Sequence, residues 1–148
     1  MTTVHVATLN ALDPTTLYGI LRLRVEVFML EQNSLYPDLD GRDTEPTTRH
    51  VWAADDSGAI LGYLRVLEEP DGQARIGRVV VAAAGRGKGL ASSLMTTALE
   101  IIGERSSVLA AQIHLAEFYG RFGYEPIGEP FQDGGIPHLP MRRTAPTA

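Results

Sequence analysis

The stretch VVVAAAGRGKGLASSLM, residues 79 to 95, constrains the fold of this 148-residue chain more than any other. An apolar run of strand type leads into three glycines within five positions, Gly85, Gly87 and Gly89, and a helical pattern follows. A glycine turn that opens a helix offers unpaired N–H groups and the positive end of the helix dipole, which together bind anions. The stretch therefore predicts a strand, an anion-binding turn and a helix, with a turn that binds nothing as the alternative.

Two common phosphate-binding motifs do not fit this turn. A P-loop requires GxxxxGK[ST], but Gly89 follows Lys88, and position 82 is alanine. A Rossmann GxGxxG fingerprint fails because Leu90 stands at its last glycine position, counted from Gly85. The turn also follows the third strand of a predicted meander, which argues against a nucleotide-binding protein of flavodoxin type, because that fold needs a parallel sheet.

The rest of the chain predicts a single α/β (α+β) domain over residues 1–148, with a mixed, mostly antiparallel sheet flanked by helices. Asp13 is expected to cap the first helix, with Pro14 at its first position. The segments DSG and PDGQ read as hairpin turns of a meander. We expect strands at 3–9, 50–55, 59–69, 74–82, 107–114, 124–129 and 136–143, helices at 12–32, 88–103 and 115–123, and a flexible tail from about 142.

Composition narrows the function classes. Thirteen Lys and Arg against eighteen Asp and Glu give a net charge of −5, so no basic face for nucleic acid is expected. No apolar run approaches the roughly 18 residues of a membrane span, and the N-terminus lacks the pattern of a signal peptide, which predicts a cytoplasmic protein without a membrane partner. The chain has no cysteine, which excludes disulfides, thiolate metal sites and cysteine nucleophiles.

The segment DLDGRD carries three acidic residues, Asp38, Asp40 and Asp43, spaced like the start of an EF-hand loop. The twelfth position of such a loop would be Arg49 rather than a bidentate glutamate, so calcium is not expected. The segment is interpreted as a turn, or as an acidic rim that attracts a cationic amine.

Three further residues are candidates for acid–base chemistry. Glu31 ends an apolar helical run, His50 opens a strand and His138 lies between two prolines; each also has an ordinary structural reading. The four histidines of the chain have no metal-ligand spacing such as HExxH, so no metal site is predicted.

The glycine turn resembles the acetyl-CoA motif of the GNAT superfamily of N-acyltransferases, whose core is Arg/Gln-x-x-Gly-x-Gly/Ala. Arg86, Gly89 and Ala91 fill these places, and Ala83 stands where a proline is common. The segment QIHLAEFYGRFGYEP resembles a later motif of that family, with Tyr119 at its tyrosine position. The resemblance implies that acetyl-CoA is bound by Val79, Val80, Val81, Arg86, Gly87, Lys88, Gly89, Leu90, Ala91, Gln112 (where asparagine is more usual) and Tyr119.

Other segments, LRLRVEVFMLEQN, YPDLDGRD, TRH and GIPHLPM, resemble the ElaA-like branch of this superfamily, and the matches together span most of the chain. The resemblance implies an acetyltransferase that uses a small-molecule or peptide amine, with a homodimer possible. A non-catalytic acyl-CoA-binding module of the same fold is the alternative.

The chemistry of such an enzyme assigns roles to these residues. An amine with a pKa of about 10.4 must lose a proton before it attacks a thioester, and Glu31, His138 or His50 is the expected base. A main-chain N–H near Val81 is expected to stabilise the charge on the carbonyl oxygen, and Tyr119 to protonate the leaving thiolate. Without cysteine, the transfer is expected to be direct, in a ternary complex.

Overall fold

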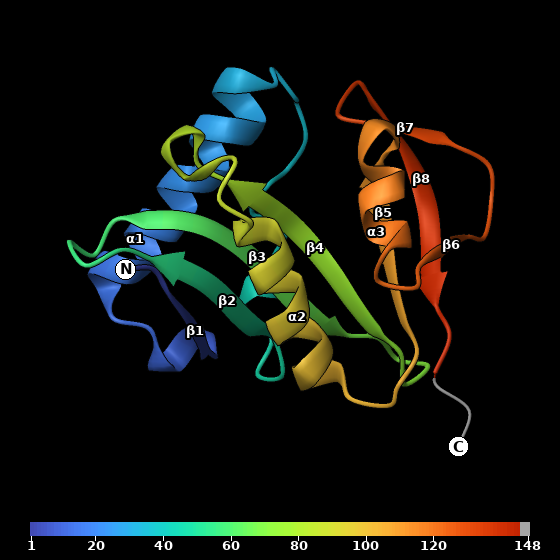
Figure 1. Ribbon diagram of the computed structural model, residues 1–148, viewed down its shortest axis with the longest axis horizontal. Helices are drawn as coiled ribbons and strands as arrows, with labels where there is room; N and C mark the ends of the chain where they lie inside the picture. The colour runs from blue at the N-terminus through green and yellow to red at the C-terminus, as the bar shows by residue number, and fades with distance from the viewer. Residues whose placement is uncertain (146–148) are drawn as a thin grey trace.

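A mixed sheet of eight strands forms the centre of the molecule over residues 1–145, the part of the chain that the computed structural model describes (Figure 1). Its order is β1-β2-β3-β4-β5-β8-β6, with β7 paired to β8. The strands are β1 (Thr3–Ala7), β2 (Arg49–Ala54), β3 (Ile60–Glu68), β4 (Ala74–Val81), β5 (Ser107–Gln112), β6 (Glu125–Pro126), β7 (Phe131–Asp133) and β8 (Ile136–Arg143). The helices are η1 (Leu9–Ala11), α1 (Pro14–Arg24), η2 (Val25–Glu31), η3 (Arg42–Thr44), η4 (Ala83–Gly85), α2 (Leu90–Ile102), η5 (Ile113–Leu115) and α3 (Ala116–Gly120).

The expected fold class is confirmed: every strand pair is antiparallel except β4 with β5. Three local expectations need correction. The strand expected at 124–129 shortens to β6, and β7 was not expected. The tail does not begin at 142, because β8 continues through Arg143 and pairs it with Ser107; residues 146–148 of the expected tail lie outside the described residues.

The first helix begins as expected, because the Asp13 side chain accepts a hydrogen bond from the Thr16 N–H at 2.9 Å. It changes pitch at Val25, where the α-helix gives way to the π-helical turn η2, which ends at Glu31. A π-helix adds residues to each turn, so it rotates the side chains that follow relative to a continuous α-helix. Glu31 and Gln32 owe their orientation to this change. None of the helices in the described residues is long and apolar enough to cross a membrane.

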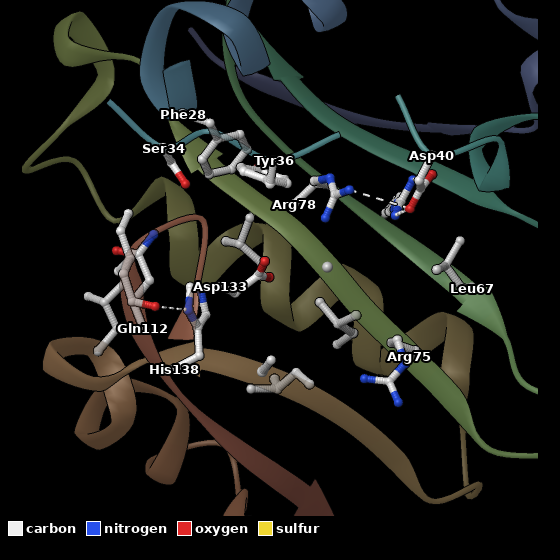
Figure 2. A pocket seen from close by; sticks show the side chains of 18 of the residues that line it. Phe28, Ser34, Tyr36, Asp40, Leu67, Arg75, Arg78, Gln112, Asp133 and His138 are labelled. Atoms are coloured by element: carbon white, nitrogen blue, oxygen red, sulfur yellow. Dashed lines mark hydrogen bonds and ion pairs between the residues drawn. The ribbon is translucent and has the colours of Figure 1, made fainter. Parts of the chain in front are cut away.

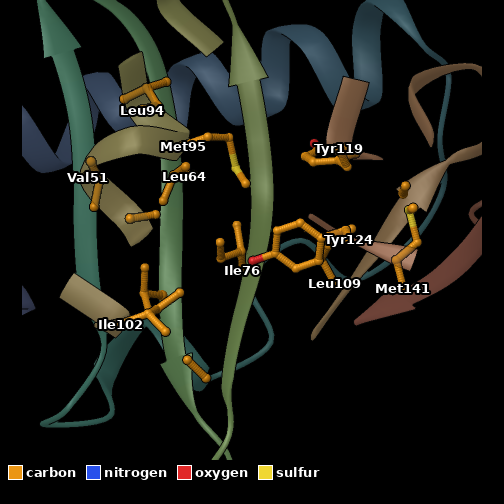
Figure 3. Close-up of a cluster of buried hydrophobic side chains, with 14 of the residues drawn as sticks. Val51, Leu64, Ile76, Leu94, Met95, Ile102, Leu109, Tyr119, Tyr124 and Met141 are labelled. Atoms are coloured by element: carbon orange, nitrogen blue, oxygen red, sulfur yellow. The ribbon is translucent and has the colours of Figure 1, made fainter. Parts of the chain in front are cut away.

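Two apolar clusters hold the helices to the sheet, one on each face. The larger cluster packs α2 on β2, β3 and β4 through side chains such as Leu64, Ile76, Leu94 and Met95, and it continues under α3 to Tyr119 (Figure 3). The smaller cluster packs α1 and η2 on the opposite face. Burial of such side chains contributes about 1.5–3 kcal/mol each. The sheet is therefore covered on both sides where β2, β3 and β4 lie together.

Charged side chains tie the segment between η2 and β2 to the sheet. The Arg24 side chain is completely buried, and it donates hydrogen bonds to Asp38 Oδ2 and Asp43 Oδ1, each at 2.9 Å. Arg65 on β3 donates to Asp43 and, at 2.5 Å, to Asp40 Oδ2. The expected acidic rim is thus wrong as a feature of the surface, because arginines from α1, β3 and β4 neutralise these carboxylates.

The pKa values of the carboxyl groups reflect this pairing. Burial alone would raise the pKa of Asp40, but the hydrogen bonds from Arg65 and from the Arg42 N–H hold it well below its ordinary value. The pKa of Asp43 is likewise lowered, because hydrogen bonds and charge from Arg24 and Arg65 outweigh its burial. Both carboxylates therefore stabilise the fold in their ionised form above about pH 4.

His50 belongs to the same buried region and has both ring nitrogens engaged. Its Nε2 lies 3.0 Å from the Asp43 carbonyl oxygen and its Nδ1 lies 2.6 Å from the Tyr63 hydroxyl. A carbonyl can only accept, so Nε2 carries the proton and Nδ1 accepts from Tyr63. Burial lowers the pKa of His50, which keeps its ring neutral.

We predict that, as the pH is lowered, the free energy of unfolding begins to decrease at a higher pH than the carboxyl groups alone would cause. The unfolded chain takes up a proton at His50 near its ordinary pKa of 6.5, while the folded ring stays neutral. The free energy of unfolding should therefore decrease as the pH drops below about 6.5, by at most about 1.4 kcal/mol per pH unit from this residue. Urea unfolding at pH 7.5, 6.5 and 5.5 measures the slope.

The variant His50→Gln should have a shallower slope between pH 7.5 and 5.5, and His5→Gln, on the exposed strand β1, should keep the slope of the wild type. An unchanged slope in His50→Gln would show that the buried ring contributes nothing to the pH dependence of stability.

Candidate active site

Strands β4 and β5 are paired only at one end. Their parallel register holds Ala74 opposite Ser107 and Arg75 opposite Val108, and the two strands diverge beyond these pairs (Figure 1). Beyond these two pairs, no ladder pairing joins the main chains of β4 and β5 across the resulting wedge. The polar backbone groups of β4 that face β5 are therefore available to a ligand that lies along the strand.

A bulge in β4 marks the point of divergence. Tyr63 pairs with Val80 and Arg65 with Gly77, so Leu64 of β3 stands opposite two residues of β4. One of these is Arg78, whose φ of 54° lies in the left-handed region that side chains rarely adopt. A bulge of this kind re-aims the side chains beyond it.

The end of β4 beyond the bulge carries apolar side chains on both faces of the sheet. Val79 and Val81 pack against the cluster under α2, and Val80 packs against the cluster under α1. This alternation leaves the main-chain edge of Val79–Val81 facing the wedge between β4 and β5. These three valines are among the residues for which the GNAT resemblance implies contact with acetyl-CoA.

The glycine turn between β4 and α2 has two distinct steric requirements. Gly85 is buried, and a Cβ there would lie 2.9 Å from Leu90 Cδ1 and 3.0 Å from the Leu61 carbonyl oxygen. Gly87 and Gly89 have φ values of 77° and 74°, and a Cβ on either would meet no atom within 4 Å. The turn is thus tight against the protein at one glycine and open to the outside at the other two.

The open side of the turn coincides with the N-terminus of α2. The first hydrogen bond of this helix runs from the Ser93 N–H to the Gly89 carbonyl oxygen at 3.1 Å, and no side chain in the described part of the chain caps its start. The N–H groups of Leu90 and Ala91 therefore precede the hydrogen-bonded ladder. Together with the helix dipole they suit an anion, and the anion site itself stays a prediction.

A cavity of about 410 Å³, here called the turn-side cavity, begins at this turn. It is bounded by η2, the end of β4, the start of α2 and α3. Its lining consists of Val27, Glu31, Gln32, Val79, Val80, Val81, Arg86, Ala91, Gln112, His114, Leu115, Phe118 and Tyr119. Most of the expected cofactor residues with apolar side chains thus share one cavity.

A second cavity of about 350 Å³, the loop-side cavity, lies between the segment 32–42, β4, β5 and the β7–β8 hairpin (Figure 2). It contains four arginines, Asp40, Asp133 and His138. The two cavities share Gln32, Val79, Gln112, Leu115 and Tyr119. The wedge between β4 and β5 therefore joins an apolar space on one side to a charged space on the other.

Two hydrogen bonds cross the wedge near this junction. The Gln112 side-chain amide donates to Gln32 Oε1 at 3.1 Å, which links β5 to the end of η2. The Ser34 hydroxyl donates to the Gly134 carbonyl oxygen at 3.0 Å, which links the segment after η2 to the β7–β8 hairpin. These contacts hold the two halves of the sheet at a fixed separation where β4 and β5 no longer pair.

Tyr119 lies at the junction and is 5% exposed. Its ring packs edge-on against Phe118 and Tyr124. Burial raises the pKa of its hydroxyl well above the ordinary value, so the group keeps its proton at neutral pH. The hydroxyl has no hydrogen-bond partner among the described residues and is free to donate to a ligand.

His138 lines the loop-side cavity, on β8 opposite Gln112. Its Nδ1 lies 2.8 Å from the Ile136 carbonyl oxygen, and its ring stacks on Phe131. Because a carbonyl only accepts, the neutral ring carries its proton on Nδ1, and Nε2 keeps a lone pair. In this tautomer, Nε2 can accept a proton from an amine, as a general base does.

Glu31 lies on the other side of the junction, in the turn-side cavity. Its carboxylate forms an ion pair of 2.8 Å with Arg86, whose Nε also donates to the Val81 carbonyl oxygen at 3.2 Å. Glu31 is therefore next to the glycine turn rather than next to His138. As catalytic residues, Glu31, His138 and Tyr119 remain predictions.

The structure does not bring His50 to this site. Its ring is 1% exposed, both nitrogens are occupied, and it lines neither cavity. The proposed role of His50 as a base is therefore wrong, and the residue supports the packing of Tyr63 and the segment around Asp43 instead.

Several lining residues were missed from the sequence. Asp133 lies on the short strand β7, and Arg75 looked like an ordinary strand arginine. Gln32 reaches the junction because of the π-helical turn. Only Asp133 carried a usable signal, since it stands in the segment QDGG directly before a glycine pair typical of a hairpin.

Comparison with known proteins identifies the family whose fold contains this sheet, in which β4 and β5 diverge. Residues 23–145 match the family model described as an acetyltransferase (GNAT) domain. The chain belongs to the GNAT family of acetyltransferases. The resemblance of the glycine turn and of the Tyr119 segment to GNAT motifs is thereby confirmed at the level of the family, which supports acyl transfer as the general activity.

Individual GNAT relatives place the chain in the ElaA-like branch. The protein ElaA of Escherichia coli K12 is 38% identical over 142 residues, which cover 90% of this chain and 91% of ElaA. A UPF0039 protein of Mycobacterium tuberculosis H37Rv is 42% identical over 135 residues, covering 89% of this chain and 86% of its own.

Solved structures agree with this placement. A crystal structure of an acyl-CoA N-acyltransferase from Pseudomonas aeruginosa superposes with a TM-score of 0.90 at 38% identity, covering 97% of this chain and 100% of that one. The crystal structure of Escherichia coli ElaA gives a TM-score of 0.89 at 34% identity, with 97% and 99% covered.

Proposed function

We propose that the protein transfers the acetyl group of acetyl-CoA directly to an amine, with both substrates bound at once. The observation that carries this proposal is the meeting of two cavities of different character at Tyr119. The turn-side cavity is apolar and ends at an anion site, which suits a long pantetheine arm with a pyrophosphate. The loop-side cavity is polar and charged, which suits a hydrophilic amine.

The residues around the glycine turn fit coenzyme A. The Arg86 N–H donates to the Ala83 carbonyl oxygen, but no main-chain hydrogen bond is found for the N–H groups of Gly87 to Ala91 in the described part of the chain, so they can donate to a pyrophosphate. The wedge-facing edge of Val79–Val81, where the Val81 carbonyl oxygen accepts from Arg86, can pair with the amide groups of a pantetheine arm as a further strand does. When bound, acetyl-CoA supplies a thioester carbon that an amine can attack and a thiolate that can leave.

Arg86 has a second role in this arrangement. Its ion pair with Glu31 lies directly beside the anion site, so a pyrophosphate offers the guanidinium a competing, doubly charged partner. Glu31 is 45% exposed and sits on the side of the cofactor. These positions favour a role for Glu31 in orienting Arg86 over a role as the base.

His138 is the base that the geometry favours. It lies in the loop-side cavity, where the amine is expected, and its Nδ1–H donates to the Ile136 carbonyl, which leaves Nε2 to accept a proton. Tyr119 keeps its proton at neutral pH and lies between the two cavities, where it can donate to the departing sulfur. The chain has no cysteine, which agrees with direct transfer.

The cofactor assignment predicts the effect of a glutamate in the turn. We expect the wild type to bind acetyl-CoA with a dissociation constant in the micromolar range. In Gly89→Glu the new carboxylate would stand in the anion site, and the affinity should fall by more than about 100-fold. The left-handed backbone at Gly89 costs a side chain about 1–2 kcal/mol, and the space around it is open, so the variant should fold. Isothermal titration calorimetry with acetyl-CoA measures the loss.

The matched control is Gly72→Glu in the β3–β4 hairpin. Gly72 has a φ of 88°, and a Cβ there also meets nothing within 4 Å, so the backbone strain is similar while the cavity is untouched. The control should bind acetyl-CoA as the wild type does. Unchanged binding in a folded Gly89→Glu protein would refute the anion site.

The assignment of Tyr119 predicts a separate kinetic effect. Tyr119→Phe should bind acetyl-CoA within a few-fold of the wild type, while turnover falls by about 100-fold or more at neutral pH. The loss should shrink toward high pH, because a thiol of pKa about 8.5 leaves unaided more readily there. Thiol release against pH, with an amine that serves as acceptor, is the measurement.

Tyr124→Phe provides the control for the loss of a nearby buried hydroxyl. The Tyr124 hydroxyl lies 2.7 Å from the Ser107 hydroxyl and its residue lines neither cavity, so this variant should lose stability but not turnover. If Tyr119→Phe and the wild type turn over equally at all pH values, Tyr119 is a packing residue.

A further inference from the structure

The loop-side cavity contains four arginines, Arg42, Arg65, Arg75 and Arg78, and three of them are held by nearby carboxylates. Arg65 donates to Asp40 and Asp43, and the Arg78 guanidinium lies 3.1 Å from Asp38 Oδ1. These pairs are largely buried, so their charges are compensated within the protein. They form one wall of the cavity, and among the buried nitrogens of these two side chains the Nε atoms of Arg65 and Arg78 are left without a hydrogen-bond partner in the described residues.

Arg42 is also paired with carboxylates. It donates to Glu45 Oε2 at 2.9 Å and to Glu69 Oε1 at 2.7 Å. Glu69 is therefore already the hydrogen-bond partner of another arginine.

Arg75 differs from the other three. Its nearest carboxylate oxygen is the same Glu69 Oε1, at 3.6 Å, which is beyond hydrogen-bond distance. Its side chain is 41% exposed, and no hydrogen bond from its guanidinium is found in the described residues. Figure 2 shows Arg75 on β4, at the end of the cavity away from His138. The planar guanidinium thus has donors free for an anion in the cavity.

The opposite end of the cavity has the complementary character. Asp133 and His138 lie near each other there, from the two strands of one hairpin (Figure 2). Asp133 has no ion pair or side-chain hydrogen bond within the part of the chain that the structure describes. A carboxylate and an imidazole whose Nε2 has no hydrogen-bond partner among the described residues suit an amine at this end.

We propose that the acceptor is a zwitterion, an amine that also carries a carboxylate or phosphate group. The amine binds beside Asp133 and His138 near Tyr119, and the anionic group accepts hydrogen bonds from Arg75. Val79 lies at the junction with Tyr119, and Arg75 precedes it by four residues, about 13 Å along a strand. Several bonds must therefore separate the amine of the acceptor from its anionic group. This inference rests on the proposed acetyl transfer and identifies the class of its acceptor.

The test compares two matched series of primary amines with acetyl-CoA. One series is the ω-amino acids from glycine to 6-aminohexanoate, and the other is the n-alkylamines of equal length. In the wild type the best ω-amino acid should have a kcat/KM at least about 10-fold higher than its neutral counterpart, because a guanidinium–carboxylate pair is charge-assisted and bidentate. The advantage should lie mainly in KM.

Variants of Arg75 link this preference to the residue. Arg75→Gln should bring the ratio between the two series close to one, and Arg75→Lys should keep part of it, because it keeps the charge without the fork. Arg22→Gln, on the exposed side of α1, should keep the full ratio. Calorimetry of 6-aminohexanoate with protein saturated in CoA gives an independent readout, and its affinity should fall only in the Arg75 variants.

The outcomes separate the two proposals. If neutral amines are acetylated as efficiently as their anionic counterparts, or if the preference survives in Arg75→Gln, the zwitterion is wrong while acetyl transfer stands. If only phosphate-bearing amines such as phosphoethanolamine show the Arg75-dependent preference, the anion is a phosphate. If neither series releases thiol, acetyl transfer to these amines is wrong and the inference falls with it.

Discussion

The rest of the site depends on how little of β4 pairs with β5. Two residue pairs join these strands, and beyond them the main-chain groups of β4 face a wedge instead of a neighbouring strand. Unpaired backbone groups in a protein interior need partners, so a ligand that pairs like a strand is the natural occupant. The bulge at Arg78, the π-helical turn before Gln32 and the hydrogen bond from Gln112 to Gln32 all lie at this wedge. Each of them helps to keep it open.

A buried set of ion pairs supports the other wall of the site. Arg24, Arg65 and Arg78 are paired with Asp38, Asp40 and Asp43, and this pairing fixes the segment between η2 and β2 against the sheet. Buried ion pairs add little net stability, because desolvation offsets their attraction, but each partner is costly to remove alone. Their contribution here is positional: they place Tyr36 and Ser34 along the loop-side cavity.

The features that depend on local sequence were predictable. The glycine turn, the meander and the Asp13 cap follow from turn chemistry and periodicity, which act within a few residues. The hydrogen bonds of Asp38 with Arg24, of His50 with Tyr63 and of Asp40 with Arg65 were not predictable, because these partners lie on α1 and β3, 14, 13 and 25 positions away. For Asp133 the sequence offered only the glycine pair that follows it: β7 is three residues long, and its pairing with β8 makes it a strand. The sequence therefore predicted an anion site at the glycine turn and left three candidates for the base, but it did not predict the tautomer or the cavity position of His138 that favour this residue in the proposal.

A crystal structure with coenzyme A bound tests the central claim most directly. If coenzyme A binds as proposed, its pyrophosphate lies at the N–H groups of Gly87 to Ala91, its pantetheine arm lies along Val79–Val81, and its sulfur lies within hydrogen-bond distance of the Tyr119 hydroxyl. Strands β4 and β5 then stay apart around the arm. A structure in which coenzyme A lies elsewhere, or in which its sulfur lies away from the junction of the two cavities, would contradict the account.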